Sequence, residues 1–404
     1  MTYKKSLLSL IFIISGIWQA LASSPEEALM EFIQTNGLPE NSVAVKIIDL
    51  SDGSTLLTHN SEASLVPASI MKSVTTAALL QKVGPDWRYH TRIYIDGPND
   101  LGYLRGNVII EGACDPSLHS DKEPYSSDII DEILNALNSQ LITRIEGDII
   151  IDESNFMGPS QPESWAKEDL KKYYGTGSHA LNFKDNTRGD FAVLNPSANF
   201  ISQLRNSIAL KGIELEGKSM SDGKRIQIHD HISAPLDEIM RSCMMRSDNL
   251  YAESMLRTYG KLEGTNGSTQ EAVVKEMDLW ETINLPTGGI NIVDGSGLSR
   301  SNRMTADFMA ALLQNMSRNP HYASFFPLAG QEGTLKSFLA DTSLDSYVAM
   351  KTGSMRGIQC YAGYKLDEDY MPTHVIVIIM NDIVKSRDKA KKASERLLLN
   401  IFGE

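Results

Sequence analysis

The sequence predicts an α/β (α+β) protein: an antiparallel sheet flanked by helices, with a β-rich domain inserted into the main one. Three observations support this prediction. Strand-like segments lie near both ends of the chain, helix-like segments lie between them, and a stretch punctuated by Gly, Pro, Asp and Asn interrupts this order. The chain has 404 residues, 42% of them hydrophobic, which is enough for one large domain or two ordinary ones.

The first 22 residues have the layout of a secretory signal peptide. Lys4 and Lys5 precede an apolar run over residues 7–18, and Ala20-Leu21-Ala22 offers a small-x-small cleavage site. The run is about a dozen residues long, short of the ~20 that span a bilayer, although an uncleaved anchor is the alternative. We therefore expect residues 1–22 to be removed, and the mature protein to be periplasmic or secreted without a transmembrane span.

The main domain is expected in two segments, residues 23–90 and 224–404. The first should hold a short helix at 26–34, then a hairpin. The hairpin strands are residues 42–50 and 55–58, joined by the turn Asp52-Gly53. Pro67 then opens an apolar helix that Gly84-Pro85 ends.

The inserted domain is expected over residues 91–223, where turn residues separate short runs of β-forming side chains. The β-like runs begin at residue 90, just before this boundary, and are residues 90–95, 107–111, 147–151 and 191–194. Helix-like spacing occurs at residues 127–138 and 200–211.

The second main-domain segment is expected to be mostly helical over residues 226–281, and to close with strands and a helix. The expected later helices are residues 304–316 and 385–402, and the expected strands are residues 348–350, 359–365 and 374–380. These strands can share one sheet with the early hairpin. Lys351 should then lie on a sheet edge that faces the helix carrying Ser69.

Three short motifs occur together and in one order, and they carry the chemistry. They are Ser69-Ile70-Met71-Lys72, Ser247-Asp248-Asn249 and Lys351-Thr352-Gly353-Ser354. A serine hydroxyl needs a nearby base, and residues three apart share one face of a helix, which pairs Ser69 with Lys72. Burial and a second cation, Lys351, would lower the pKa of Lys72. The pattern indicates acyl transfer on a peptide or β-lactam carbonyl, with no metal and no cofactor.

Each motif alone is weak evidence, because serine-x-x-lysine also occurs at residues 164–167, 221–224 and 386–389. Order and context distinguish the set. Ser69 starts a long apolar helix, Ser247 precedes a helical run, and Lys351 follows one strand-like run and precedes another.

These three motifs resemble those of penicillin-binding proteins and serine β-lactamases. Residues 294–300 (Asp-Gly-Ser-Gly-Leu-Ser-Arg) and 333–335 (Gly-Thr-Leu) narrow the resemblance. They are similar to the low-molecular-mass class C, or type 4, group of exported D-alanyl-D-alanine carboxypeptidases and endopeptidases. Residues 115–118 and 147–156 resemble the inserted region of that family. The resemblance covers nearly all of the mature chain and implies a penicillin-binding transpeptidase/β-lactamase-like fold.

The resemblance also implies catalytic roles. Ser69 would be the acylated nucleophile, Lys72 its base, and Ser247 a relay of the proton to the leaving amine. Asn249 would bind the substrate amide, and Lys351 would act in both catalysis and carboxylate binding.

Further positions would bind substrate. Thr352 would hold the terminal carboxylate with Lys351, within the segment that includes Gly353 and Ser354. The backbone N–H groups of Ser69 and Ser354 would form the oxyanion hole. Asp152 and Arg300 match positions that hold a diamino acid side chain in the family, and Arg356 stands where the family would have glutamine.

The function predicted is that of an exported serine-type DD-peptidase that hydrolyses peptidoglycan stem peptides and is acylated by β-lactams. A serine β-lactamase or esterase, and a non-catalytic wall-binding protein, are the alternatives. The net charge of −13, with no basic stripe, argues against nucleic acid as a partner. Cys114, Cys243 and Cys360 fit no zinc pattern, and His229-Asp230-His231 is expected to be a solvated strand edge rather than a metal site. Oligomeric state, cysteine pairing, and the balance of carboxypeptidase and endopeptidase activity stay open.

Overall fold

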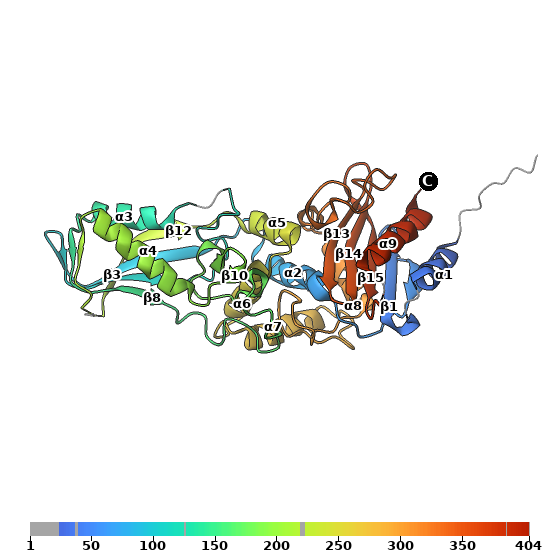
Figure 1. Cartoon of the computed structure of the whole chain (residues 1–404), viewed down its shortest axis with the longest axis horizontal. Helices are drawn as coiled ribbons and strands as arrows, with labels where there is room; N and C mark the ends of the chain where they lie inside the picture. Colours follow the sequence, from blue (N-terminus) through green and yellow to red (C-terminus); the bar gives the residue numbers. More distant parts are fainter. Residues whose placement is uncertain (1–23, 37–38, 125–126, 219–222, 385, 404) are drawn as a thin grey trace, which may run out of the picture.

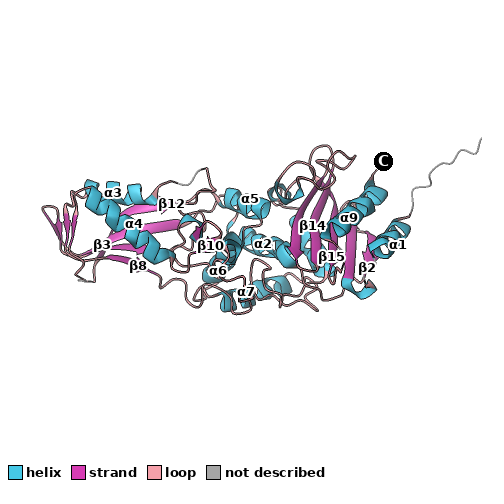
Figure 2. Cartoon of the chain, viewed as in Figure 1, coloured by secondary structure: helices cyan, strands magenta, loops and turns pink. Residues whose placement is uncertain are grey.

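The molecule is elongated, with the main domain at one end and the inserted domain at the other (Figure 1). The computed structural model describes residues 24–36, 39–124, 127–218, 223–384 and 386–403. The expected signal peptide, residues 1–22, lies outside the described residues. The expected mixed architecture is confirmed, because helices and several sheets alternate along the chain (Figure 2).

The main domain is built on a five-stranded antiparallel sheet in the order β13-β14-β15-β1-β2. The strands are β1 (Val43–Asp49), β2 (Thr55–His59), β13 (Val348–Met355), β14 (Ile358–Leu366) and β15 (Pro372–Met380). The early hairpin therefore joins the late strands as expected, and β13, which carries Lys351, is an edge strand.

Both faces of this sheet are covered, because side chains alternate between two hydrophobic clusters along β15. Val375, Val377 and Ile379 belong to one cluster, while Ile376 and Ile378 belong to the other. Helices α1 (Pro25–Asn36) and α9 (Arg387–Phe402) cover one face, and α8 (Ala306–Met316) lies against the other (Figure 1).

A helical layer lies between the main sheet and the inserted domain (Figure 1). Its helices are α2 (Met71–Val83), α5 (Leu236–Arg246), α6 (Asn249–Leu262) and α7 (Thr269–Thr282), and α6 packs against both α2 and α7. The 3-10 turn η2 (Ala68–Ile70) leads directly into α2.

The inserted domain has its own core under a four-stranded sheet, ordered β12-β3-β6-β8. The strands are β3 (His90–Asp96), β6 (Asn107–Glu111), β8 (Ile149–Asp152) and β12 (Arg225–Ile232), and the helices are α3 (Ile129–Ser139) and α4 (Pro196–Leu210). A smaller sheet joins β4 (Asn99–Asp100), β5 (Tyr103–Leu104), β7 (Arg144–Ile145) and β11 (Glu214–Leu215), and β9 (Thr187–Arg188) pairs with β10 (Phe191–Ala192).

The expectation of helix from residue 226 is wrong over β12. Apolar and polar side chains alternate through Ile226, Gln227 and Ile228, and this period of two favours a strand. β12 pairs with β3 inside the inserted sheet, and His229 and His231 lie on this edge strand. The expectation that both are solvated is wrong for His231, which is buried against Glu132. Since a boundary at 223 would separate β12 from its own sheet, we propose residues 90–232 as the inserted unit.

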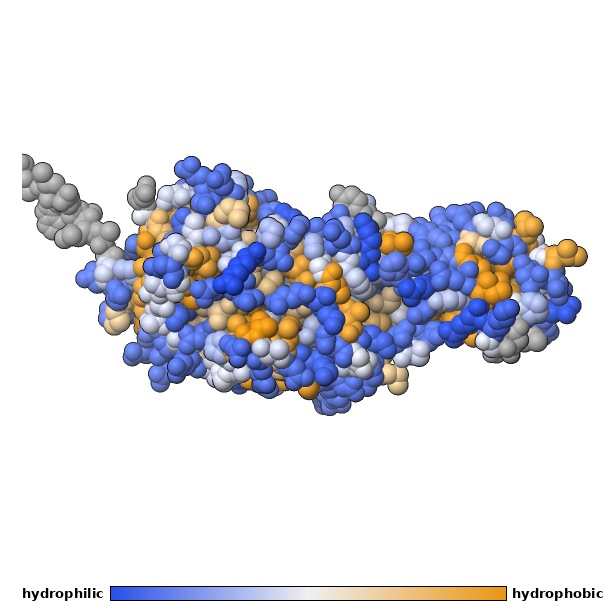
Figure 3. Space-filling view, turned by 180° about the vertical axis from the view of Figure 1, so that it is seen from behind, coloured by the Kyte–Doolittle hydropathy of each residue, from blue (hydrophilic) through white to orange (hydrophobic). Residues whose placement is uncertain are grey.

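The visible surface is mainly hydrophilic, and the cysteines are buried. Figure 3 shows a face on which hydrophilic side chains predominate and hydrophobic ones form scattered patches. Among the described helices, none is long and apolar enough to cross a bilayer. The three cysteines are buried and free, as expected for small apolar side chains.

Candidate active site

Ser69 lies in a tight turn at the start of α2. The preceding residue, Ala68, has a φ of 48°, in the left-handed region that non-glycine residues rarely adopt. Gly297 packs directly against this turn, because a Cβ there would overlap the carbonyl oxygen of Ala68. The loop containing the Gly-Ser-Gly stretch therefore supports the turn that presents the Ser69 hydroxyl.

Lys72 is completely buried, and its amine is held by three oxygen atoms. Its Nζ donates to Ser69 Oγ at 3.2 Å, to Asn249 Oδ1 at 2.7 Å and to the Ser296 carbonyl at 2.7 Å. Burial lowers the pKa of Lys72, although nearby groups, including Asp294 and Glu253, partly oppose this shift. The neutral amine can accept a proton across the same contact to Ser69.

The second motif follows α5. Ser247 has a left-handed backbone, with φ 58° and ψ 42°, and its Oγ accepts a hydrogen bond from Lys351 Nζ at 2.9 Å. Asn249 is 9% exposed, and its Nδ2 donates to the carbonyl of Tyr174 at 2.7 Å. The Asn249 amide is therefore fixed at both ends, between Lys72 and a loop of the inserted domain.

The third motif lies on β13, against η2. Lys351 is completely buried; burial, and then the charge of Lys72, lowers its pKa well below the usual value. Gly353 permits this close approach, since a Cβ there would lie 2.6 Å from the carbonyl oxygen of Pro67. Thr352 Oγ1 donates to Thr334 Oγ1 at 2.9 Å, and Ser354 Oγ donates to Gln359 Oε1 at 2.5 Å.

The three motifs thus meet at one place. Lys72 contacts both Ser69 and Asn249, Lys351 contacts Ser247, and β13 runs beside the Ser69 turn. The charge of Lys72 adds to burial in lowering the pKa of Lys351, so a proton on one amine disfavours a proton on the other.

Arg300 and Arg356 contact each other, and Asp152 lies apart from them, in the inserted domain. Arg300 Nη2 donates to the Arg356 carbonyl at 2.7 Å, next to the β13–β14 turn. Asp152 lies at the end of β8 and forms an ion pair with Arg225 at 2.6 Å, within the inserted domain. Hydrogen bonds from Ser154 and Arg225 outweigh burial and lower the pKa of Asp152.

Sequence reasoning missed a buried carboxylate behind Lys72. Glu253, on α6, accepts from the backbone N–H of Ser296 at 2.8 Å, and the Ser296 carbonyl accepts from Lys72. Burial and the neighbouring Asp294 raise the pKa of Glu253 above its ordinary value. The one available signal was spacing, because Glu253 follows Asn249 by one helical turn on the same face.

This fold and site define a class: penicillin-binding and β-lactamase-like proteins with an inserted domain. A solved structure of penicillin binding protein 4 from Haemophilus influenzae superposes with a TM-score of 0.81, at 22% identity over 92% of this chain and 98% of that one. A predatory endopeptidase of Bdellovibrio bacteriovorus matches with a TM-score of 0.55 at 18% identity, over 88% of this chain and 91% of that one.

The chain belongs to the D-Ala-D-Ala carboxypeptidase 3 (S13) family, whose model matches residues 26–189 and 177–399. It is 23% identical to the D-alanyl-D-alanine carboxypeptidase DacB of Haemophilus influenzae, over 82% of this chain and 84% of that protein. It is also 23% identical to the D-alanyl-D-alanine carboxypeptidase of Actinomadura sp. strain R39, over 79% and 74%. The resemblance noted from the motifs, and the enzyme class it implies, are confirmed.

Proposed function

We propose that this chain is an exported serine-type D-Ala-D-Ala carboxypeptidase and DD-endopeptidase that hydrolyses peptidoglycan stem peptides through an acyl-enzyme on Ser69. The observation that carries the proposal is the contact between Lys72 Nζ and Ser69 Oγ, 3.2 Å long and made by a buried amine of lowered pKa. Penicillin, whose ring carbonyl takes the place of the scissile peptide carbonyl, would acylate the same hydroxyl.

Acylation begins when neutral Lys72 takes the proton of Ser69 and the oxygen attacks the carbonyl carbon. The backbone N–H groups of Ser69 and Ser354 stabilise the oxyanion. Ser247, hydrogen-bonded to Lys351, passes a proton to the departing amine. Water then attacks the acyl carbonyl carbon, the ester bond to Ser69 Oγ breaks, and Ser69 takes its proton back from Lys72 across the same contact.

Substrate binding helps to assign protons to the two amines. A terminal carboxylate beside Lys351 and Thr352 favours the charged form of Lys351, because opposite charges stabilise each other. Two charged amines in one buried site repel, so the proton on Lys351 favours neutral Lys72. A C-terminal D-alanine carboxylate therefore prepares the base. Asn249 would bind the substrate amide, and Arg300 and Arg356 would bind an anionic side chain of the substrate.

Covalent labelling with a fluorescent penicillin tests the proposal. The purified protein should be labelled with a 1:1 stoichiometry, Ser69→Ala should not be labelled, and mass spectrometry should place the adduct on Ser69. Digestion of purified muropeptides should release D-alanine and cleave cross-linked dimers. An intact protein that is not labelled at saturating probe contradicts the proposal.

Two other results would favour a different function for this protein. Rapid turnover of the penicillin would indicate a β-lactamase, because a peptidase stays acylated for long periods. Stem-peptide binding that is unchanged by Ser69→Ala, without release of D-alanine, would indicate a wall-binding protein. Detection of a mature protein that begins after residue 22 would support export.

A further inference from the structure

Ser247 lies in a loop whose backbone needs external support. It adopts a left-handed conformation directly after α5, and in this conformation its hydroxyl accepts a hydrogen bond from Lys351. Asp248 caps α6 by accepting from the Leu250 N–H at 3.0 Å, which holds the segment after Ser247. The position of the Ser247 side chain therefore depends on how firmly its two neighbours, Arg246 and Asp248, are held.

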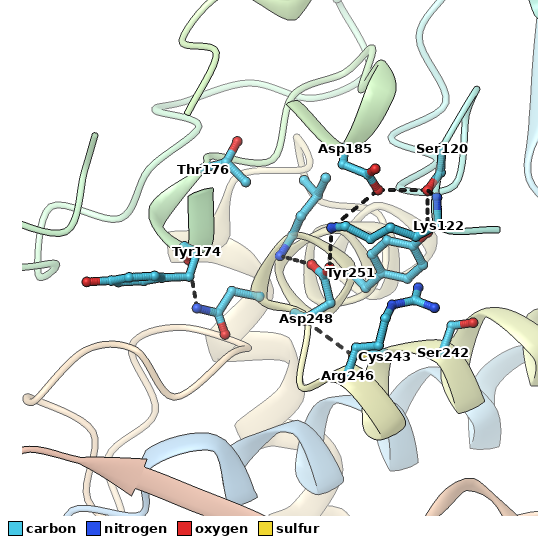
Figure 4. Close-up of polar contacts among 12 residues, drawn as sticks. Ser120, Lys122, Tyr174, Thr176, Asp185, Ser242, Cys243, Arg246, Asp248 and Tyr251 are labelled. Carbon is cyan, nitrogen blue, oxygen red and sulfur yellow. Dashed lines mark hydrogen bonds and ion pairs between the residues drawn. The ribbon is translucent and has the colours of Figure 1, made fainter. Parts of the chain in front are cut away.

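Consecutive residues of the inserted domain hold both of those neighbours. Lys122 Nζ donates to Asp248 Oδ2 at 3.0 Å, and the Glu123 carboxylate forms an ion pair with Arg246 (Figure 4 shows the Lys122 side of this clamp). We call Lys122 and Glu123 the 122–123 clamp. It reaches the motif from more than 100 positions away in the sequence, at separations of 126 and 123.

The clamp is itself well supported on both sides. In the inserted domain, Lys122 also pairs with Asp185 at 3.5 Å, and Asp185 accepts from Ser120 Oγ at 2.7 Å. In the main domain, Glu123 accepts from Ser242 Oγ at 2.9 Å and from Tyr251 Oη at 2.8 Å. Glu123 and Asp185 are mostly buried, so these contacts are better shielded from water than surface ion pairs.

We propose that Lys122 and Glu123 are positioning residues for acyl transfer: through Asp248 and Arg246 they hold Ser247 in the left-handed backbone that aligns its hydroxyl with Lys351. This inference rests on the proposed function, which gives Ser247 its role in proton transfer. It assigns the inserted domain a direct part in the reaction, in addition to any part in binding substrate. Misplacement of a reacting group by about 1 Å can slow a reaction about 100-fold, so a clamp of this kind affects rate more than affinity.

The test uses Lys122→Met, which keeps the length of the side chain and removes its charge. Lys122→Arg keeps the charge and the reach, and Lys218→Met removes an exposed lysine paired with Glu216 elsewhere in the inserted domain, as a control. The acylation rate constant with fluorescent penicillin, kcat and KM on a D-Ala-D-Ala peptide, and Tm are measured for each full-length variant.

Lys122→Met should lower the acylation rate and kcat by about 10- to 100-fold, with KM within about threefold of the wild type. Lys122→Arg should restore most of the rate, and Lys218→Met should match the wild type. In a Ser247→Ala background, Lys122→Met should cost almost nothing further, because a residue that acts through Ser247 loses its effect when that hydroxyl is gone.

Three results would overturn the proposal. They are a Lys122→Met rate within about twofold of the wild type, an equal loss in Lys122→Arg, and a full additional loss in the Ser247→Ala background. The last two would show that Lys122 only stabilises the fold. Failure of the proposed function is recognised separately, because the wild type itself would then not be labelled.

Discussion

At the scale of single residues, the site concentrates conformations and charges that are costly elsewhere. Ala68 and Ser247 both have left-handed backbones, which cost about 1–2 kcal/mol each in non-glycine residues. Lys72 and Lys351 are both fully buried amines. Such features persist only where surrounding contacts impose them, and here each belongs to, or directly precedes, a residue proposed to react.

The base role of Lys72 predicts the effect of its removal and of pH. Lys72→Ala should abolish penicillin acylation at every pH, because no other amine contacts Ser69 Oγ among the described residues. In the wild type the rate should rise with pH as the neutral amine becomes populated. Since burial lowers the pKa of Lys72, the midpoint of this rise should lie below the usual lysine value of 10.5.

Rates of penicillin labelling, measured by quenching the reaction at set times between pH 5 and 10, test both the loss in Lys72→Ala and the pH dependence of the wild type. Lys82→Ala is the matched control, because Lys82 lies on the same helix but pairs with Glu263 at 2.7 Å, away from Ser69. If Lys72→Ala is still labelled, another group acts as the base for Ser69.

At the scale of elements, α3 is fixed to the edge strand β12 by a shared carboxylate. Glu132 Oε2 accepts from His229 Nε2 at 2.7 Å and from His231 Nδ1 at 3.0 Å, and its other oxygen accepts from Ser127. Burial alone would raise the pKa of Glu132, but the bonds from His231, Ser127 and His229 lower it to about 2. Burial alone would lower the pKa of His231, but Glu132 outweighs it and raises that pKa.

These shifts predict a pH window for the stability of the inserted domain. Because the pKa of Glu132 is lowered in the folded state, its interactions contribute their whole stabilisation above pH 4.5. That stabilisation is lost as the pH falls toward about 2. The raised His231 pKa contributes stability below 6.5 that is lost as pH rises through the folded value. Glu132→Gln should therefore destabilise most near pH 5.5, by about 1–2 kcal/mol after allowance for solvent screening.

Denaturant unfolding of the wild type and of Glu132→Gln at pH 5.5 and 9 checks this prediction. Asp131→Asn provides the control, since Asp131 lies on the exposed side of α3. An equal loss of stability at both pH values would mean that the histidines do not contribute through charge.

At the scale of the whole molecule, one buried arginine connects the two domains. Arg257 on α6 is 1% exposed and donates to three carbonyl groups. Nε donates to Gly267 at 2.8 Å, Nη2 donates to Met157 at 2.9 Å, and Nη1 donates to Ser178. Two of these acceptors belong to the inserted domain, so α6 begins at the second motif and also makes a main attachment of the insert.

Arg257→Met should lower the free energy of unfolding by about 3 kcal/mol or more, because three buried carbonyls lose a charged donor. Thermal unfolding measures the loss, with Arg205→Met as the control, since that arginine pairs with Asp148 at the surface of the insert. A Tm unchanged from the wild type would show that other contacts attach the insert.

Much of the fold could be predicted because periodicity is a local property. The hairpin, the helix after Pro67 and the last three strands were expected at nearly the residues where they occur. The helix expected from residue 226 was wrong because helical spacing after Leu236 was extended backwards over β12. The pairing of that strand with β3, at the other end of the insert, has no local signal.

The sequence by itself determined the family, the three motifs and the covalent order of the elements, because these depend on residue type and spacing alone. Only the tertiary structure decided how the motifs are supported. It placed Glu253 behind the Ser296 loop, the 122–123 clamp beside Ser247, and Asp152 with Arg225 rather than with Arg300. Each of these contacts joins residues far apart in the chain. Its partner is therefore set by how distant segments fold against one another, which no spacing records.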